Sequence, residues 1–298
     1  MNYINLKANA KINLALDVVC KRDDGYHDLS MIMQTLKLHD NILIKKSNRF
    51  KLKLITNLGW LPVDERNLVY KAISLIQQNY NVPCGVIVEI KKNIPVSAGL
   101  GGGSADCAAA LIGMRRLFNL LIPNSELLQM AKTLGADVPY CLMQGTVLAQ
   151  GIGDKLTKLE NHPHVYVLLA KPNISVSTVG VFKSLDLQSI DKRPNIDNMI
   201  KNIQLGNLVG ITNNFCNVLE NVTEVNFPII KDIKSIMYHH GALGALMSGS
   251  GPTVFGYFEN KSDAVATIKY LKLNKKSVRE VYLTGIFNRA RRGRYEQG

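Results

Sequence analysis

The chain has 298 residues, of which 46% are hydrophobic and 20% charged, and its formal net charge is +13 at pH 7. This composition is typical of a globular protein with a buried core, and the length suggests two domains. The apolar stretch over residues 165–170 is far shorter than the ~20 residues that span a bilayer. Lys7 and Lys11 also interrupt the N-terminus, where a secretory signal would be apolar. We therefore expect no membrane segment and a cytoplasmic location.

The five cysteines are scattered and form no C-x-x-C pair, which indicates reduced thiols rather than a disulfide framework. The charge favours anionic partners, and the chain stays basic without its arginine-rich last residues, 288–298. Charge alone does not choose between small phosphates and a polynucleotide.

In chain order, apolar alternation predicts a first strand over residues 3–19 with Lys11 on its polar face, followed by a turn at KRDDGYHDL. Apolar residues at helical spacing then predict a helix over residues 67–80. For the remainder of the first half we expect strands over 31–38, 41–55 and 85–91, helices over 104–118 and 124–134, and a turn and strand in GADVPYCLMQG.

The second half mixes strands and helices without a regular βαβ alternation, as does the first, and this predicts the α+β class. We place the domain boundary so that residues 1–156 form an N-terminal domain and residues 157–298 a C-terminal one. In the second half we expect strands over 165–170, 245–247, 254–258 and 278–285, and helices over 196–202, 227–240 and 262–271.

The segment over residues 95–110 reads PVSAGLGGGSADCAAA, a run of glycines that leads directly into an alanine-rich stretch. Glycines let backbone N–H groups converge on an anion, and the following helix points its positive dipole end at the same place. The simpler alternative is a helix cap formed by Ser104 or Asp106. Four glycines between residues 99 and 103 exceed what a cap needs, so we favour a cradle for a nucleotide phosphate. The segment matches neither the P-loop nor the dinucleotide fingerprint.

Phosphoryl transfer needs a cation near the transferred group and a carboxylate that orients or deprotonates the nucleophile. Asp137, in the rigid turn GADVP, and Lys11, in the first strand, are candidates. Taken alone, Asp137 is as well explained by a turn or a helix cap and Lys11 by a solvated strand face. A second glycine cluster, MSGSGPT at residues 247–253, forms either a hairpin turn or a further source of N–H groups for an anion.

The glycine-rich segment resembles the phosphate loop of the GHMP small-molecule kinases, P-x-x-x-G-L-G-[SG]-[SG]-S-A. The motifs AKINLAL, DGYH, NLVYKA, GADVPYCL and GSGPTVFG are similar to one branch of that family, in the same order, from Lys11 to Gly256. The resemblance implies a two-domain α+β GHMP kinase fold, with an N-terminal domain like ribosomal protein S5 domain 2 and a ferredoxin-like C-terminal domain. It also implies an ATP- and Mg²⁺-dependent kinase of non-mevalonate isoprenoid synthesis, with ligands between the two domains.

For the acceptor, the resemblance implies a small molecule linked to cytidine diphosphate. Asp137 is then the base for its tertiary hydroxyl, Lys11 stabilises the carboxylate and the developing phosphoryl charge, and Asn13 orients the hydroxyl. The residues implied at the cytidine are Tyr26, His27 and Phe182.

For the donor, the resemblance implies that Asn67 meets the adenine and that Ser104 lies near the phosphate oxygens and Mg²⁺. The full segment implied in ATP binding is Pro95, Val96, Ser97, Ala98, Gly99, Leu100, Gly101, Gly102, Gly103, Ser104 and Ala105.

Two alternatives remain. A mevalonate- or homoserine-type kinase of the same family is disfavoured by DGYH and the Lys11 strand. An RNA-binding module would explain the charge and the arginine-rich end, but it requires aromatic and basic residues interleaved on a sheet, which the sequence lacks. We expect no membrane or nucleic-acid partner and a monomer or homodimer.

Overall fold

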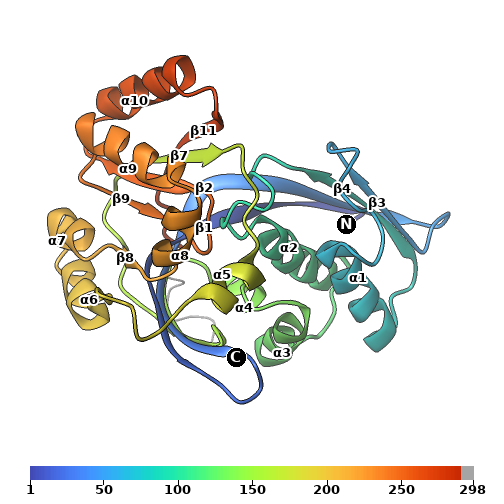
Figure 1. Ribbon diagram of the computed structural model, residues 1–298. Helices are drawn as coiled ribbons and strands as arrows, with labels where there is room; N and C mark the ends of the chain where they lie inside the picture. The colour runs from blue at the N-terminus through green and yellow to red at the C-terminus, as the bar shows by residue number, and fades with distance from the viewer. Residues whose placement is uncertain (290–298) are drawn as a thin grey trace.

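The computed structural model describes residues 1–289, and two sheets with helices packed on them form its framework (Figure 1). The first sheet has seven strands, with the path β3-β4-β2-β1-β8; β5 pairs with β2, and β6 pairs with β5. Its strands are β1 (Tyr3–Lys21), β2 (His27–Ser47), β3 (Leu52–Thr56), β4 (Gly85–Lys91), β5 (Thr146–Gly151), β6 (Lys155–Lys158) and β8 (Cys216–Asn217).

Strand β2 differs from the prediction, because one strand replaces the two expected over residues 31–38 and 41–55. The strand continues through the polar pair His39–Asp40, which separates the two expected ranges. Asp40 is fully buried there and accepts hydrogen bonds from the backbone N–H groups of Asn93 and Ile94. The expected second strand is itself wrong at residues 48–51, where the chain leaves the sheet before β3.

Four helices cover one face of this sheet: α1 (Leu68–Asn79), α2 (Gly102–Leu117), α3 (Asn124–Leu134) and α4 (Val138–Met143) (Figure 1). The alanine-rich α2 packs on β1 and β2 and is itself covered by the other three helices. The prediction of a turn and strand around residues 135–145 is wrong, since α4 occupies most of this segment. Pro139 falls in the first turn of α4, where a helix needs no N–H donor.

The second sheet has the order β11-β7-β10-β9, and every neighbouring pair is antiparallel. Its strands are β7 (Tyr166–Pro172), β9 (Gly244–Met247), β10 (Val254–Phe258) and β11 (Val278–Gly285), and α9 (Ile229–His239) and α10 (Lys261–Asn274) pack on it. The succession β7-α9-β9-β10-α10-β11 with this strand order is the ferredoxin-like arrangement, which confirms the expected α+β fold with a ferredoxin-like C-terminal part.

Between β7 and α9 the chain forms short elements that the sequence analysis mostly missed. Only α6 (Ile196–Gln204) was predicted; α5 (Thr178–Ser184), α7 (Leu208–Asn213), β8 and α8 (Glu220–Asn226) were not. Strand β8 pairs in parallel with β1 at Ala15 and Leu16, so this segment completes the first sheet. The domain boundary at residue 156 stays a prediction.

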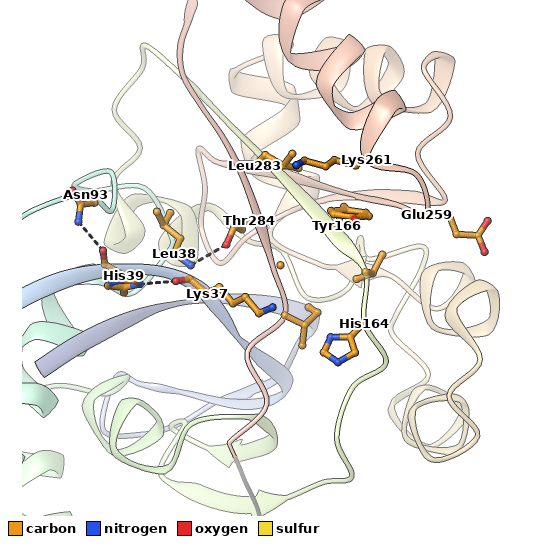
Figure 2. A pocket seen from close by; sticks show the side chains of 13 residues that line it. Lys37, Leu38, His39, Asn93, His164, Tyr166, Glu259, Lys261, Leu283 and Thr284 are labelled. Atoms are coloured by element: carbon orange, nitrogen blue, oxygen red, sulfur yellow. Dashed lines mark hydrogen bonds between the residues drawn. The ribbon is translucent and has the colours of Figure 1, made fainter.

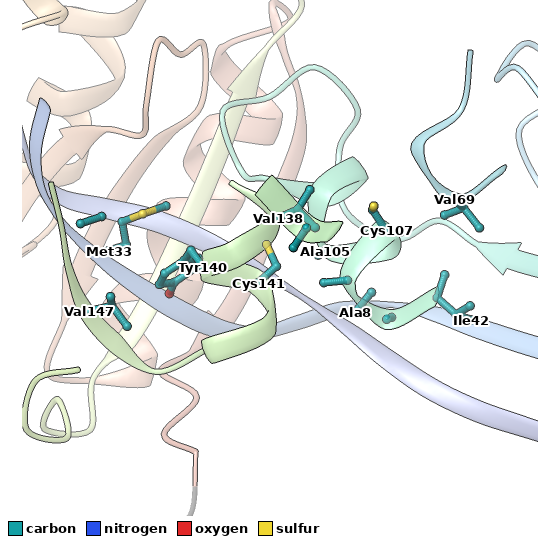
Figure 3. Packing of buried hydrophobic residues seen from close by; sticks show 14 of the residues in the cluster. Ala8, Met33, Ile42, Val69, Ala105, Cys107, Val138, Tyr140, Cys141 and Val147 are labelled. Atoms are coloured by element: carbon teal, nitrogen blue, oxygen red, sulfur yellow. The ribbon is translucent and has the colours of Figure 1, made fainter. Parts of the chain in front are cut away.

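Burial explains how the two halves hold together. Figure 3 shows Tyr140 of α4 beside Met33 of β2 and Val147 of β5, with Val138 of α4 and Cys107 of α2 further along, in a cluster that extends from the first half into the second sheet and its helices. A second buried cluster joins Ile12 and Leu14 of β1 to Val167, Leu169 and Phe255 of the second sheet. Strand β1 is therefore covered on both faces. Over the part of the chain described, no helix is both long and apolar enough to cross a membrane.

Candidate active site

Lys11, Asn13 and Asp137 come together at the centre of the molecule. Lys11 Nζ donates a hydrogen bond to Asn13 Oδ1 at 2.8 Å and lies 3.4 Å from Asp137 Oδ2. Lys11 and Asn13 are two residues apart on β1 and share a face, as alternation predicts. Asp137 precedes α4, and its side chain makes no cap hydrogen bond to that helix. The carboxylate is therefore available to the lysine and to a ligand.

The alternative of a solvated strand face for Lys11 is wrong. Lys11 is only 5% exposed, because β1 is covered on both faces, whereas the side chain of Asp137 is 34% exposed. A buried ammonium needs a charged or hydrogen-bonded partner, and Asp137 and Asn13 supply both. The arrangement presents one reachable carboxylate beside a fixed positive charge.

The glycine-rich segment lies directly against Lys11. The backbone N–H of Lys11 donates to Leu100 O at 3.0 Å, and a Cβ on Gly101 would lie 2.9 Å from Lys11 Cγ. Gly99 and Gly101 have φ of 74° and 67°, in the left-handed region that glycine adopts without strain. The loop therefore passes so close to the lysine that residue 101 has no room for a side chain.

The glycine-rich segment also lines a cavity of about 320 Å³. Residues 95–104 all border it, together with Asn67 and residues from the loop before α1; Ala105 is buried beneath and does not. Asn67 is the N-cap of α1, with its Oδ1 accepting from Val69 N at 2.9 Å and its Nδ2 donating to Pro62 O at 2.8 Å. The structure thus places the residues predicted for ATP around one hollow at the N-terminus of α2.

The helix-cap alternative for this segment is wrong. Helix α2 begins at Gly102, its cap position is Gly101, and no side chain caps it. Ser104 lies in the first turn and borders the cavity, whereas Asp106 is buried inside the helix. The N–H groups of the first turn thus have no side-chain cap at the cavity, which is the condition for binding an anion there.

The second glycine cluster reaches the same place. Ser248 Oγ donates to Gly99 O at 2.9 Å, and a Cβ on Gly249 would lie 3.6 Å from both Lys11 Nζ and Asn13 Oδ1. Its backbone is held from below by Asn217, whose Nδ2 donates to Met247 O and Gly249 O, each at 2.8 Å. Asn217 was not predicted, and no motif in the sequence marks it.

A buried charged cluster beside the cavity was also missed. Lys92 Nζ bonds to Asp106 Oδ2 at 2.6 Å and to Asp40 Oδ2. Burial raises the pKa of Asp106 well above its usual range, although Lys92 opposes this shift. Burial lowers the pKa of Lys92, but Asp106 and Asp40 outweigh it and raise that pKa overall. The sequence signal that could have revealed this cluster is Asp106, a single acidic residue among the small and apolar residues of α2.

The residues predicted for the cytidine lie at the far end of the β1–β2 hairpin. The rings of His27, at the start of β2, and Phe182, in α5, are in contact with centroids 5.2 Å apart. Tyr26 is close in sequence, but its side chain is 63% exposed. The structure therefore brings His27 and Phe182 together and leaves Tyr26 at the surface. Of the arginine-rich end, Arg289 donates to Leu142 O and Met143 O, and Arg291, Arg292 and Arg294 lie outside the described residues.

A larger hollow of about 780 Å³ lies where β2 meets β7 and β11. Figure 2 shows Lys37, His39 and His164 around it, with Thr284 accepting a hydrogen bond from Leu38 N. None of the predicted site residues borders it. Its size alone does not make it the candidate site, since it has no glycine-rich loop.

Comparison with known proteins covers both halves of the chain. Residues 67–145 match the GHMP kinases N terminal domain, and residues 192–276 match the GHMP kinases C terminal model. A Lachnospira eligens protein named 4-diphosphocytidyl-2-C-methyl-D-erythritol kinase is 47% identical over 96% of this chain and 99% of its own. A Caldicellulosiruptor saccharolyticus protein of that name is 48% identical over 94% and 95%. A crystal structure of 4-(cytidine 5'-diphospho)-2C-methyl-D-erythritol kinase matches with a TM-score of 0.82 at 29% identity, covering 96% of this chain and 100% of that one.

Proposed function

Because the chain belongs to the GHMP kinase family, and is therefore a small-molecule kinase, we propose that it transfers the γ-phosphoryl group of ATP to the 2-hydroxyl of 4-diphosphocytidyl-2-C-methyl-D-erythritol. The proposal rests mainly on the contact between the Lys11–Asp137 pair and the glycine-rich phosphate loop. Lys11 Nζ lies 3.4 Å from Asp137 Oδ2, while the stem of the same lysine fills the space that a side chain at Gly101 would need. This contact supports a site in which a base and a donor phosphate meet.

The proton is taken by Asp137. Its carboxylate accepts the proton of the acceptor hydroxyl as the oxygen attacks the γ-phosphorus, and ADP leaves on the opposite side. Lys11 holds the carboxylate in place and places a positive charge beside the transferred group, and Asn13 orients the hydroxyl. Catalysis of this kind consists mostly of positioning and charge neutralisation.

The phosphates of ATP lie on the backbone N–H groups of residues 99–104, with the adenine toward Asn67. Mg²⁺ takes few protein ligands and keeps several waters, so a cluster of acids is not required. The side-chain oxygens at this cavity include those of Ser97, Ser104 and Asp106, and Asp106 Oδ1 is buried without a partner among residues 1–289. These residues fit the ion, which when bound neutralises phosphate charge.

The cytosine of the acceptor binds at the aromatic pair of His27 and Phe182, with Tyr26 closing over it. An imidazole supplies a hydrogen-bonding edge and a phenyl ring a stacking face, and a pyrimidine uses both. The β1–β2 hairpin carries His27 near its tip and Asn13 in its body, and α5 adds Phe182, so two elements together hold the two ends of the acceptor.

The proposal is tested by ADP release in the presence of ATP, Mg²⁺ and one acceptor at a time. We expect turnover with 4-diphosphocytidyl-2-C-methyl-D-erythritol and none above background with mevalonate or homoserine. Turnover with either of the latter, and not with the cytidyl compound, would replace the proposed acceptor by another of this family.

The role of Asp137 is tested by Asp137→Asn, which keeps the shape of the side chain and removes its basicity. We expect kcat to fall by about 100-fold or more, as general-base catalysis of this type contributes. Glu259→Gln removes an exposed carboxylate outside the site and serves as the control. A kcat for Asp137→Asn within a few-fold of wild type would show that another group takes the proton.

A further inference from the structure

The segment that carries Phe182 is held to the body of the protein by partly buried apolar side chains and by a small set of side-chain hydrogen bonds. We call residues 173–195, between β7 and α6, the acceptor strap. Most of α5 within it is exposed, but Val181 is buried, and Thr178 Oγ1 lies 2.7 Å from Ser250 Oγ in the second glycine cluster. These contacts fix the beginning of the strap. In its second half, Leu185, Leu187 and Ile190 pack against the main hydrophobic cluster, and polar contacts form a further attachment near its end.

Arg193 makes that second attachment with a fork of hydrogen bonds. Its Nη1 donates to Asp17 Oδ1 at 2.7 Å and to Val18 O at 3.0 Å, and its Nη2 donates to Leu187 O at 3.1 Å. The guanidinium therefore joins three pieces of chain: the end of the strap, its middle, and strand β1. A planar group suits this role because its two terminal nitrogens donate in fixed directions to acceptors on different pieces of chain.

The strand that Arg193 binds is part of the hairpin that carries His27. Asp17 and Val18 of β1 pair with Ser30 and Leu29 of β2, two to three residues from His27. The same hairpin and strap meet again where the rings of His27 and Phe182 touch, 5.2 Å apart. Arg193 thus fixes the distance between the two elements whose aromatic rings form the cytidine end of the site.

We propose that Arg193 is a positioning residue that holds the acceptor strap against the β1–β2 hairpin and thereby sets the KM for the acceptor. The inference rests on the proposed function, since it takes Phe182 and His27 as the cytosine-binding pair. When the strap is already ordered, the acceptor does not have to order it on binding. The phosphate loop and its cavity receive no contact from Arg193, so ATP binding is independent of it.

The test is Arg193→Met, with steady-state kinetics in which each substrate is varied in turn. We expect the KM for the acceptor to rise about tenfold or more, with kcat and the KM for ATP within about twofold of wild type. The matched control is Lys192→Met, which removes the same charge from the neighbouring residue. The Lys192 side chain is exposed and makes no hydrogen bond or ion pair within residues 1–289, so this variant should leave all three constants unchanged.

Asp17→Asn weakens the same contact from the other side, and it keeps the proposal testable if Arg193→Met does not fold. We expect Asp17→Asn to raise the KM for the acceptor in the wild-type background and to add almost nothing in the Arg193→Met background, since both changes remove one interaction. An unchanged acceptor KM in both single variants, or an equal rise in the KM for ATP, would overturn the proposal.

A measurement without turnover separates this inference from the proposed function. In hydrogen–deuterium exchange, Arg193→Met should speed exchange of amides over residues 178–192 by about tenfold and leave α1 unchanged. Wild-type protein that shows no turnover with the cytidyl acceptor would refute the proposed function, whereas unchanged exchange over residues 178–192 would refute the role of Arg193 by itself.

Discussion

At the scale of single residues, the site depends on how closely backbone and side chain approach. The stem of Lys11 passes over Gly101, whose φ of 67° places it in the left-handed region. A lysine that is buried and held between Asn13 and Asp137 has little freedom to move aside. The glycine at position 101 is therefore required twice, once for the path of the loop and once for the position of the ammonium.

Gly101→Ala should lower kcat by about tenfold or more, because the new Cβ at 2.9 Å from Lys11 Cγ displaces the Nζ from Asp137. The left-handed backbone adds about 1 kcal/mol of strain to the folded state. Gly206→Ala is the matched control, since Gly206 has φ of 64° and nothing within 4 Å of its Cβ position. It should show a similar loss of stability in denaturant unfolding and no loss of kcat. Equal kcat in the two variants would contradict the role given to the contact.

At the scale of elements, the second glycine cluster is a loop whose backbone is hydrogen-bonded by side chains of the segment β8–α8. Asn217 donates to Met247 O and Gly249 O and accepts from Leu219 N, so its whole amide is used. Glu220 accepts from Met247 N and bonds to Lys234 at 2.8 Å. Because β8 also pairs with β1, the same short segment sets the loop relative to Lys11 and Asn13.

Asn217→Ala should lower the free energy of unfolding by about 2 kcal/mol, because it leaves two buried carbonyl groups without their donor. We also expect a higher KM for ATP, since Ser248 in this loop bonds to the phosphate loop at Gly99. Asn274→Ala removes an exposed amide at the end of α10 and should cost less than about 0.5 kcal/mol. Equal unfolding midpoints for the two variants would show that the loop does not depend on Asn217.

At the scale of the whole molecule, His162 is buried in the connection between β6 and β7. Its Nδ1 lies 2.7 Å from Pro163 O and its Nε2 3.3 Å from Tyr257 OH of the second sheet, while its carbonyl accepts from Asn288. Burial lowers the pKa of this imidazole to about 4, an effect that the bond to Pro163 O only partly opposes. The neutral ring is thus part of the folded state.

Stability should therefore depend on pH through His162. A histidine pKa lowered from its unfolded value of about 6.5 contributes stability above pH 6.5, and this contribution is lost as the pH falls toward 4. The loss amounts to about 3 kcal/mol for a shift of this size. This loss is measured by urea unfolding of the wild type and of His162→Gln at pH 7 and at pH 4. Other groups titrate equally in both proteins, so comparing the two proteins isolates the contribution of His162. Between pH 7 and pH 4, the wild type should lose about 3 kcal/mol more of its free energy of unfolding than His162→Gln does. An equal loss in the two proteins would contradict the role given to the buried, neutral His162.

Much of the fold could be predicted because long elements carry a strong period. Strand β1 and helices α1, α3 and α9 lie close to their expected ranges, and the ferredoxin-like part follows its expected order of strands and helices. The short elements between β7 and α9 could not be predicted, because each is stabilised by contacts with distant parts of the chain. The two-residue strand β8 exists only because β1 lies beside it. Strand β2 continues through the buried Asp40, between the two expected strands, because Asp40 is satisfied by partners more than fifty residues away.

The sequence by itself predicted the α+β class, which is confirmed, and proposed a phosphate loop with Lys11 and Asp137 as candidates, because glycine content and periodicity are local properties. The resemblance to the GHMP kinases, carried by the order of the motifs, strengthened both candidates and added Asn13. Only the tertiary structure decided that Lys11 is buried against Gly101, that Asn217 supports the second glycine cluster and that Arg193 joins the acceptor strap to β1. Asn217 and Gly249 are 32 positions apart in the sequence, Lys11 and Gly101 are 90 apart, and Asp17 and Arg193 are 176 apart. Such pairs leave no spacing that can be read along the chain, and only the folding of the phosphate loop, β8 and the acceptor strap onto β1 brings them together.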